Sequence, residues 1–436
     1  MNNKQRNKVH FLLGLFYQFE YFKHSLKLKL KRTRKSYRRV ILMLILPLLV
    51  GQLSAENNYP IVLVHGFVGW GPEEMGGYHY WGGKEDLVAY LELQGHEVYE
   101  VSVGPVSSNW ERAVEAYTQI KGGQVDYGKS HAEKWGIVQM PKGKVYEGLY
   151  PQWDENHPVH LIGHSMGGQT IRMLSYLLTE IFYTEEDTVP EAGDLLGQSR
   201  QGWIKSISTF ATPHNGTTLS DIITKSIPFL QNFIGLAAVV GTNFYDFDLE
   251  HWNFDRQEEE TWMEYFRRVR EHPAWNTQNI CAWDLSIDGA RELNGYLQAN
   301  PEIYYFSFAL SSTHVDSATG YHLPNDDTSL ILKAKARQMG KKTVYWDDGT
   351  VTDSTWFESD GVVNTISQFG PTTGLTGPDP IAEYHEDEPL IPGQWYVFGP
   401  LSADHWKIIG HGVTDEEREE IFTIYREHCD RLNHLP

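Results

Sequence analysis

The fold of this chain is decided by one stretch, VHLIGHSMGG at residues 159–168. An apolar run ends there in the pattern Gly-x-Ser-x-Gly, and residues 169–174 continue with helical spacing. A serine on a sharp turn between a strand and a helix has its hydroxyl pushed out of the sheet, and glycines at the flanking positions let the backbone close that tightly. The pattern therefore predicts that Ser165 is a nucleophile. The alternative is an ordinary glycine-rich turn.

A second apolar run, PIVLVHGF at residues 60–67, ends in His-Gly followed by an aromatic residue. Acyl transfer needs two backbone N–H donors aimed at the oxyanion, one from the residue after the nucleophile and one from a loop that leaves an early strand. These positions are Met166 and Phe67. Gly66 lets the loop approach the reacting carbonyl closely. The alternative is that His65 and Gly66 merely end a strand.

The chain alternates apolar strands, glycine turns and helical patterns, which predicts an α/β fold with a mostly parallel sheet and helices on both faces. The expected strands cover residues 61–64, 96–103, 159–162, 204–210, 303–308 and 395–398. Two long segments between them, at about 107–157 and 219–299, are interpreted as insertions, where functional loops and lids are common. With 436 residues, the chain is long enough for one large sheet with such insertions.

The N-terminal segment is typical of a secretory signal peptide. Residues 1–39 carry twelve Lys or Arg and one acid, residues 40–50 form a short apolar core, and the small residues before position 56 offer a cleavage site near Ala55. We therefore expect residues 1–55 to be the signal peptide, residues 56–436 to be the catalytic domain, and the protein to be secreted or periplasmic. A permanent membrane anchor and a start codon assigned too early are the alternatives, although the apolar run is short for a span.

The remaining chain is strongly acidic. Residues 40–436 contain 25 basic and 56 acidic side chains, which gives a net charge near −31. So acidic a surface argues against nucleic acid and anionic headgroups as partners. Cys281 and Cys429 are the only cysteines, so there is no disulfide framework, although one bridge between them is permitted.

A nucleophilic serine needs a general base, and the base needs an acid that fixes its tautomer. In folds that carry the nucleophilic serine on such a turn between a strand and a helix, the chain order of the triad is serine, acid, histidine. His405 follows the last expected strand through a short loop, and Asp360 lies on a polar turn just before an apolar run. We expect these two residues to complete the triad. The remaining candidates are His385, His411 and His428 for the base, and Asp326, Asp327 and Asp404 for the acid.

Taken together, these motifs resemble the secreted α/β-hydrolase lipases of thermophilic bacilli, which are related to the staphylococcal lipases. The matching segments are residues 64–71, 80–83, 104–110, 125–128, 211–214, 245–247, 284–286, 360–365 and 404–405. The resemblance implies an α/β-hydrolase fold with Ser165, Asp360 and His405 as the triad. It also implies that Phe67 and Met166 form the oxyanion pair and that the region 219–240 forms a lid.

The resemblance also implies two metal sites, and this chain departs from both. The family holds a structural zinc between two carboxylates and two histidines, and the matching positions here are Glu111, His131, Ile137 and Glu250. Because a structural zinc prefers four ligands, zinc would need water or a neighbour such as His251 beside the three remaining groups. The family's calcium site uses a carboxylate two residues after the triad histidine, where this chain has Lys407. We expect no calcium there, and the chemistry itself requires no cofactor.

The sequence therefore predicts a secreted lipase that hydrolyses the carboxylic esters of acylglycerols at an oil–water interface through an acyl-enzyme. A broad-specificity esterase, a phospholipase or a polyester hydrolase on the same triad is the alternative, because pocket shape sets acyl and headgroup preference. A third hypothesis is a non-catalytic protein that adsorbs to lipid. The intact serine, acid and histidine argue against it.

The nearly all-apolar run at residues 229–240 yields a prediction about the lid. If this run covers Ser165 in water, opening exposes apolar surface, which is unfavourable in solution and favourable at an oil interface. Replacing Phe233 and Ile234 with Ser should weaken activation by emulsified substrate and leave hydrolysis of a short soluble ester intact. Kinetics on both substrates check this, and equal loss on both would mean that the run belongs to the core.

Overall fold

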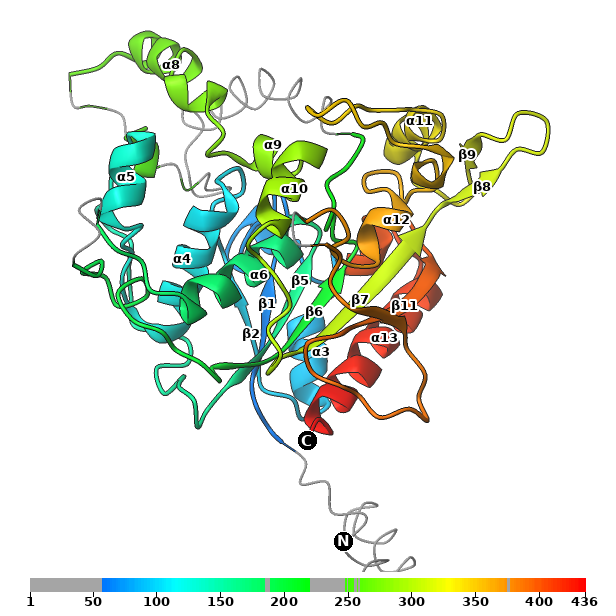
Figure 1. The fold of residues 1–436 in the computed structure, drawn as a ribbon, viewed down its shortest axis with the longest axis horizontal. Coiled ribbons are helices and arrows are strands. Elements are labelled where there is room, and N and C mark those ends of the chain that lie inside the picture. The colour runs from blue at the N-terminus through cyan, green and yellow to red at the C-terminus, as the bar shows by residue number, and fades with distance from the viewer. Residues whose placement is uncertain are drawn as a thin grey trace, which may run out of the picture. The chain divides into compact units, whose positions relative to one another are not determined.

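Seven parallel strands form the centre of the computed structural model, in the order β10-β11-β7-β6-β5-β1-β2 (Figure 1). Apolar runs explain the central strands β1, β5 and β7, since a strand buried on both faces has no polar side to show to water. The bounds of the seven strands are Ile61–Val64 for β1, Val98–Val101 for β2, Val159–His164 for β5, Ile204–Phe210 for β6, Tyr304–Ser311 for β7, Ile381–Glu383 for β10 and Trp395–Ser402 for β11.

The structure describes residues 57–184, 189–219, 248, 250–254, 257, 259–374 and 377–436. Within it, residues 58–433 form one compact unit. The helices are α3 (Leu87–Leu93), α4 (Asn109–Lys121), α5 (Lys129–Trp135), α6 (Met166–Thr179), α8 (Trp262–Arg270), α9 (Cys281–Asp284), α10 (Ile287–Asn294), α11 (Leu330–Met339), α12 (Thr365–Gln368) and α13 (Asp415–Asn433). Two small antiparallel pairs, β3 (Gly123–Gln124) with β4 (Val145–Tyr146) and β8 (Thr313–Val315) with β9 (His322–Pro324), lie outside the main sheet.

Helices cover both faces of the sheet, as the sequence predicts. The connection β1-α3-β2 runs toward one edge of the sheet and β5-α6-β6 runs toward the other. Since such crossovers are right-handed, α3 and α6 lie on opposite faces. Helix α4 packs beside α6, and α13 packs beside α3, where the rings of Tyr90 and Phe422 are 5.0 Å apart (Figure 1).

A stack of aromatic rings joins the sheet to α13. The ring of Phe210 on β6 lies between Phe308 on β7, at 4.2 Å, and Tyr425 on α13, at 4.5 Å, and both pairs are nearly parallel. All three side chains are buried. Because Phe210 is the last residue of β6, this packing fixes the carboxyl edge of the sheet, where the functional groups of such folds lie.

The expected strands agree with the structure at β1 and β6, whereas β2 is shorter and β5, β7 and β11 are longer than expected. Strand β10 was not expected. It is a three-residue edge strand whose residues are exposed or half-buried, so it has no apolar run to reveal it.

Several expectations concern residues outside those that the structure describes. They are the signal peptide at residues 1–55 and the lid run at residues 229–240. None of the described helices combines the length and apolar character needed to cross a membrane. Cys281 and Cys429 are both buried and both free, so the permitted bridge is not formed.

Candidate active site

Ser165 stands on a sharp turn between β5 and α6, as the pentapeptide predicts. Its backbone has φ 55° and ψ −127°, a conformation that residues other than glycine rarely adopt. The glycines around it are required for space, because a Cβ at Gly163 would lie 2.5 Å from the backbone of Gly167, and a Cβ at Gly167 would overlap the carbonyl oxygen of Val64. The turn is held from β6, where the carbonyl oxygen of Phe210 accepts the Ser165 N–H at 2.8 Å.

The structure brings Ser165, His405 and Asp360 together in one hydrogen-bonded chain. His405 Nε2 lies 2.9 Å from Ser165 Oγ, and His405 Nδ1 lies 2.8 Å from Asp360 Oδ2. An ionised carboxylate only accepts hydrogen bonds, so Nδ1 is the donor to Asp360 and Nε2 is the acceptor for the serine hydroxyl. All three side chains are buried, which limits competition from water.

The carboxylate of Asp360 is held by more than the histidine. Its Oδ1 accepts the N–H groups of Val362 at 2.9 Å and Val363 at 2.7 Å, and its Oδ2 accepts a hydrogen bond from Gln368 Nε2 at 3.2 Å. The backbone N–H of His405 also donates to the backbone carbonyl oxygen of Asp360. These bonds satisfy a buried charge and fix the carboxylate toward the imidazole.

The alternative acids and bases are engaged elsewhere or exposed. Asp404 accepts hydrogen bonds from the N–H and hydroxyl of Ser329, the residue before α11, and from two backbone N–H groups that follow Asp404. Asp327 lies 3.5 Å from Lys407, His411 contacts the carbonyl oxygen of Tyr80, and His428 contacts Ser208. The side chains of Asp326 and His385 are exposed.

The two expected oxyanion donors lie beside the serine. Met166 is the first residue of α6, where backbone N–H groups have no partner within the helix. Phe67 follows Gly66, at which a Cβ would lie 2.8 Å from Ser165 Cβ, so the loop passes directly over the nucleophile. Both Phe67 and Ser165 line the same cavity.

Sequence reasoning did not assign roles to Tyr80 and His164, which link the two halves of the site. Tyr80 Oη accepts the Gly66 N–H at 2.8 Å and lies 2.7 Å from His164 Nδ1, while His164 Nε2 lies 3.0 Å from the carbonyl oxygen of His405. Burial holds the pKa of His164 well below its usual value, so the ring stays neutral. From the sequence, Tyr80 was noted only as part of the family segment at residues 80–83.

Ser165 and His405 face a small apolar cavity of about 120 Å³. The remaining walls come from the loop after β6, from α11 and from the turn after Asp360, and the lining includes Pro213, Leu219, Leu285, Leu332, Lys335, Val362, Val363 and Trp406. The apolar lining suits the hydrocarbon part of an ester.

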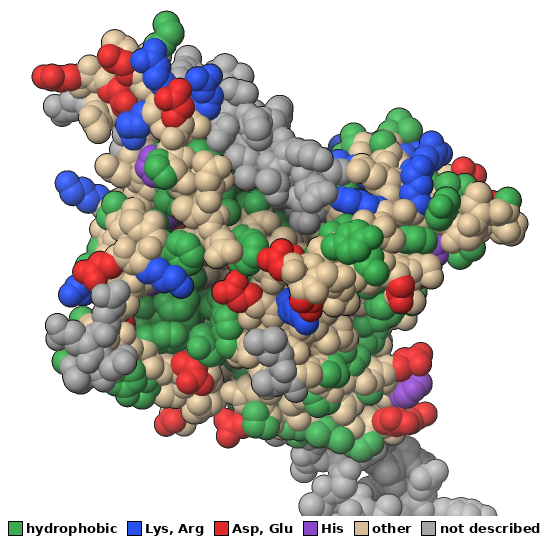
Figure 2. Space-filling view, turned by 45° about the horizontal axis from the view of Figure 1, so that its top comes forward, with side chains coloured by type: hydrophobic (Ala, Val, Ile, Leu, Met, Phe, Trp, Pro, Cys, Tyr) green, Lys and Arg blue, Asp and Glu red, His purple; other side chains and the backbone are tan. Residues whose placement is uncertain are grey.

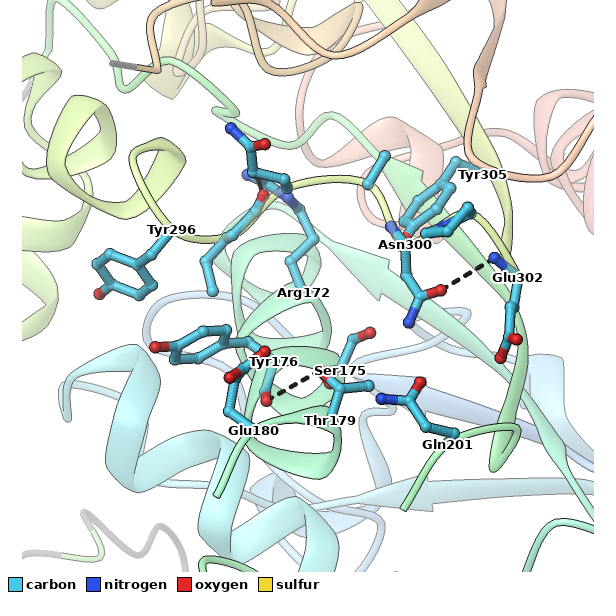
Figure 3. A pocket seen from close by; sticks show the side chains of 14 residues that line it. Arg172, Ser175, Tyr176, Thr179, Glu180, Gln201, Tyr296, Asn300, Glu302 and Tyr305 are labelled. Atoms are coloured by element: carbon cyan, nitrogen blue, oxygen red, sulfur yellow. Dashed lines mark hydrogen bonds between the residues drawn. The ribbon is translucent and has the colours of Figure 1, made fainter. Parts of the chain in front are cut away.

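A separate pocket of about 380 Å³ lies beside the second half of α6 (Figure 3). Arg172, Tyr176 and Thr179 line it from α6, and Asn300 and Glu302 line it from the segment before β7. Its described lining includes no histidine or cysteine, so this pocket has no serine–histidine pair like that of the other site.

A family model described as "Lipase-like, C-terminal domain" matches residues 57–432 of this chain. The chain belongs to this family. A lipase of Staphylococcus hyicus is 35% identical over 393 residues, which cover 87% of this chain and 58% of that relative. The chain thus spans little more than half the length of the curated relatives it matches.

Solved structures agree with this assignment. EstA from Clostridium botulinum is similar with a TM-score of 0.77 and 39% identity, over 87% of this chain and 88% of that one. The Staphylococcus hyicus lipase is similar with a TM-score of 0.76 and 32% identity, over 87% and 97% of the two chains. These matches confirm the α/β-hydrolase fold and the resemblance to staphylococcal lipases.

The expected zinc ligands are distributed over two separate groups of charged side chains: a pair and a cluster. In the pair, Glu111 on α4 lies 2.7 Å from His131 on α5. Glu111 also accepts hydrogen bonds from Ser108 and, at 2.7 Å, from Asn279. Burial would raise the pKa of Glu111, but His131, His251 and Ser108 together outweigh it and lower that pKa to about 2. The carboxylate is therefore charged and satisfied without a metal.

The second group is a cluster around Lys144, whose Nζ lies 2.8 Å from Asp248, 3.2 Å from Glu115 and 3.6 Å from Glu250. Burial would lower the pKa of Lys144, but the acids, Glu115 foremost, hold it well above its usual value. Within the part of the chain that the structure describes, no group of three or more His, Cys, Asp or Glu is placed to hold a metal ion. His251, the neighbour named above as a replacement ligand, is buried and acts on the pKa of Glu111, so zinc at this site stays a prediction.

The charge pairing leads to a prediction about chelation. Because Lys144 supplies positive charge to Glu250 and His131 already bonds to Glu111, a chelator should change the melting temperature by no more than about 2 °C. Differential scanning fluorimetry with and without a chelator measures this. Zinc present at one equivalent in purified protein, together with a large fall in melting temperature on its removal, would contradict the prediction.

Proposed function

We propose that this chain is a lipase that hydrolyses carboxylic esters of acylglycerols through an acyl-enzyme. The observation that carries the proposal is the buried chain of hydrogen bonds from Asp360 through His405 to Ser165, at the wall of an apolar cavity. The lipase names of its relatives support the substrate class.

In the first half of the reaction, Ser165 Oγ attacks the ester carbonyl while His405 Nε2 takes its proton. The imidazolium that forms is stabilised by Asp360, whose carboxylate is already fixed by the N–H groups of Val362 and Val363. His405 then gives the proton to the departing alcohol, and an acyl group remains on Ser165. In the second half, water attacks the acyl group with His405 again as base, which releases the fatty acid.

The tetrahedral intermediate places negative charge on the former carbonyl oxygen. We assign the stabilising donors to the backbone N–H groups of Phe67 and Met166, which flank Ser165 from the loop after β1 and from the start of α6. The contact of Tyr80 with Gly66 and with His164 would hold this loop and the His405 segment in mutual register.

We also propose that the substrate is presented at an oil–water interface and that the protein acts outside the cytoplasm. The first part rests on the apolar lining of the cavity and on the names of the relatives. The second rests on the signal-peptide pattern of residues 1–55.

Replacement of the nucleophile tests the proposal. Ser165→Ala should lower turnover of both an emulsified triacylglycerol and a short soluble ester by at least about 10³-fold, because the attacking oxygen is lost. Ala is small enough for the turn, so the thermal transition should remain near that of the wild type. Activity within about tenfold of the wild type would rule out Ser165 as the nucleophile.

Two matched carboxylate variants test the assignment of the acid. Asp360→Asn should lower turnover by about 10⁴-fold, because an amide favours the wrong histidine tautomer and cannot stabilise the imidazolium. Asp404→Asn, one residue before the same histidine, should cost less than about tenfold, because the Asp404 carboxylate bonds to Ser329 and not to the imidazole. Steady-state kinetics on a soluble ester decide between them. The reverse ranking would move the acid to Asp404.

A further inference from the structure

Basic side chains gather on α11 and the turn that follows it. They are Lys333, Lys335, Arg337, Lys341 and Lys342, which make up 5 of the 25 basic residues in positions 40–436. Residues 328–346 contain no Asp or Glu. Figure 2 shows this blue cluster at the upper right of the face in view, over α11. In a chain with a net charge of −20, such a local excess of positive charge indicates a surface that binds a negatively charged partner.

Exposed apolar side chains accompany the charges. Leu330 and Ile331, in the first turn of α11, are 85% and 73% exposed, and Tyr345 beyond the basic cluster is 67% exposed. One exposed leucine is unremarkable. Two adjacent aliphatic residues beside five cations form the pattern of a helix that lies in a lipid–water interface.

Helix α11 is fastened to the active site at both of its ends. At its start, the N–H and hydroxyl of Ser329 donate to Asp404, the neighbour of His405. After its end, Lys342 Nζ donates to the carbonyl oxygen of Thr218 at 2.7 Å, in the loop that lines the cavity. Between these points, Leu332 lines the same cavity as Ser165. A surface bound by α11 would therefore lie beside the opening to the nucleophile.

Four acids flank this cluster in sequence, Asp326 and Asp327 before it and Asp347 and Asp348 after it, and Asp348 lies 2.6 Å from Arg291. Asp326 and Asp327 precede α11, and Asp327 lies 3.5 Å from Lys407, which also pairs with Glu417 at 2.8 Å. Lys333 donates to the backbone carbonyl oxygen of Asp326 and not to a carboxylate.

We propose that α11 and its following turn, residues 330–345, are the surface with which this protein adsorbs to a negatively charged lipid surface. A negatively charged lipid surface repels the acidic remainder of the chain. Electrostatics therefore favour an approach in which the basic cluster faces the lipid. Leu330 and Ile331 then enter the interface. The inference rests on the proposed function, because ester hydrolysis releases fatty-acid carboxylates that make an oil surface negative. It revises the expectation, drawn from net charge alone, that anionic headgroups are excluded.

A fluorescent reporter tests where the protein touches the lipid. Burial raises the thiol pKa of both Cys281 and Cys429, so an environment-sensitive dye should react selectively with the introduced thiol in Ile331→Cys. The matched control is Leu93→Cys, at a position on α3 that is 84% exposed. Both are made in the full chain carrying Ser165→Ala, so that no lipid is hydrolysed during the measurement.

With vesicles of phosphatidylcholine and phosphatidylglycerol, the dye at position 331 should shift to shorter wavelength, and the dye at position 93 should not. Pure phosphatidylcholine vesicles should produce little shift at either position. A bound protein without a shift at position 331, or equal shifts on the two kinds of vesicle, would overturn the proposal. The basic residues 1–39 are common to both labelled proteins, so they cannot produce the difference.

Charge variants give the affinity. The triple variant Lys333→Gln, Arg337→Gln, Lys341→Gln should weaken binding to the anionic vesicles by roughly 100-fold, since each removed cation contributes to attraction near the surface. Its control removes the same charge elsewhere, through Lys84→Gln, Lys142→Gln and Arg270→Gln, and should bind nearly as the parent does. Equal weakening by both triples would reduce the effect to net charge and overturn the proposal.

Hydrolysis of a short soluble ester, with Ser165 intact, separates this inference from the proposed function. Both triple variants should retain the wild-type rate, which also reports that they are folded. If the wild type does not hydrolyse the ester, the proposed function fails while the vesicle measurements still decide the role of α11.

Discussion

The strained backbone at Ser165 is the constraint on which the rest of the site depends. A positive φ at a serine costs about 1–3 kcal/mol and persists only where its surroundings enforce it. Here the enforcement comes from close backbone contacts: Gly167 packs against Val64 of β1, and the Ser165 N–H and C=O bond to Phe210 and Thr212 at the end of β6. The parallel sheet and its aromatic stack thus hold one hydroxyl where a base can reach it.

Buried charges are compensated in two different ways in this protein. The Asp360 carboxylate is paired with a histidine whose other nitrogen faces Ser165, so one end of the network is available for chemistry. The Glu111 carboxylate bonds to His131 and Asn279, and the Lys144 ammonium pairs with Glu115 and Asp248. The first arrangement can pass a proton to and from a substrate, while the second fastens the insertion after α4 to the body of the fold.

The nucleophile and the sheet could be predicted from sequence because both leave local patterns: flanking glycines at the turn and uninterrupted apolar runs in buried strands. The partners of Ser165 were harder to predict, since several acids and histidines follow the sheet; chain order and position favoured Asp360 and His405, and the family motif agreed with that choice. The contacts of Tyr80 with His164 span 84 positions and leave no local pattern. Strand β10 has no apolar run, and the basic cluster on α11 disappears in a whole-chain average dominated by acids.

The central claim is that the buried chain from Asp360 to His405 makes Ser165 the single activated nucleophile. Mass spectrometry after reaction with a fluorophosphonate tests it most directly, because the reagent phosphonylates only a serine with an activating base. The account predicts one adduct per chain, located on the peptide that contains Ser165 and lost when His405 is replaced by Ala. An unmodified protein, or an adduct on any other serine, would contradict it.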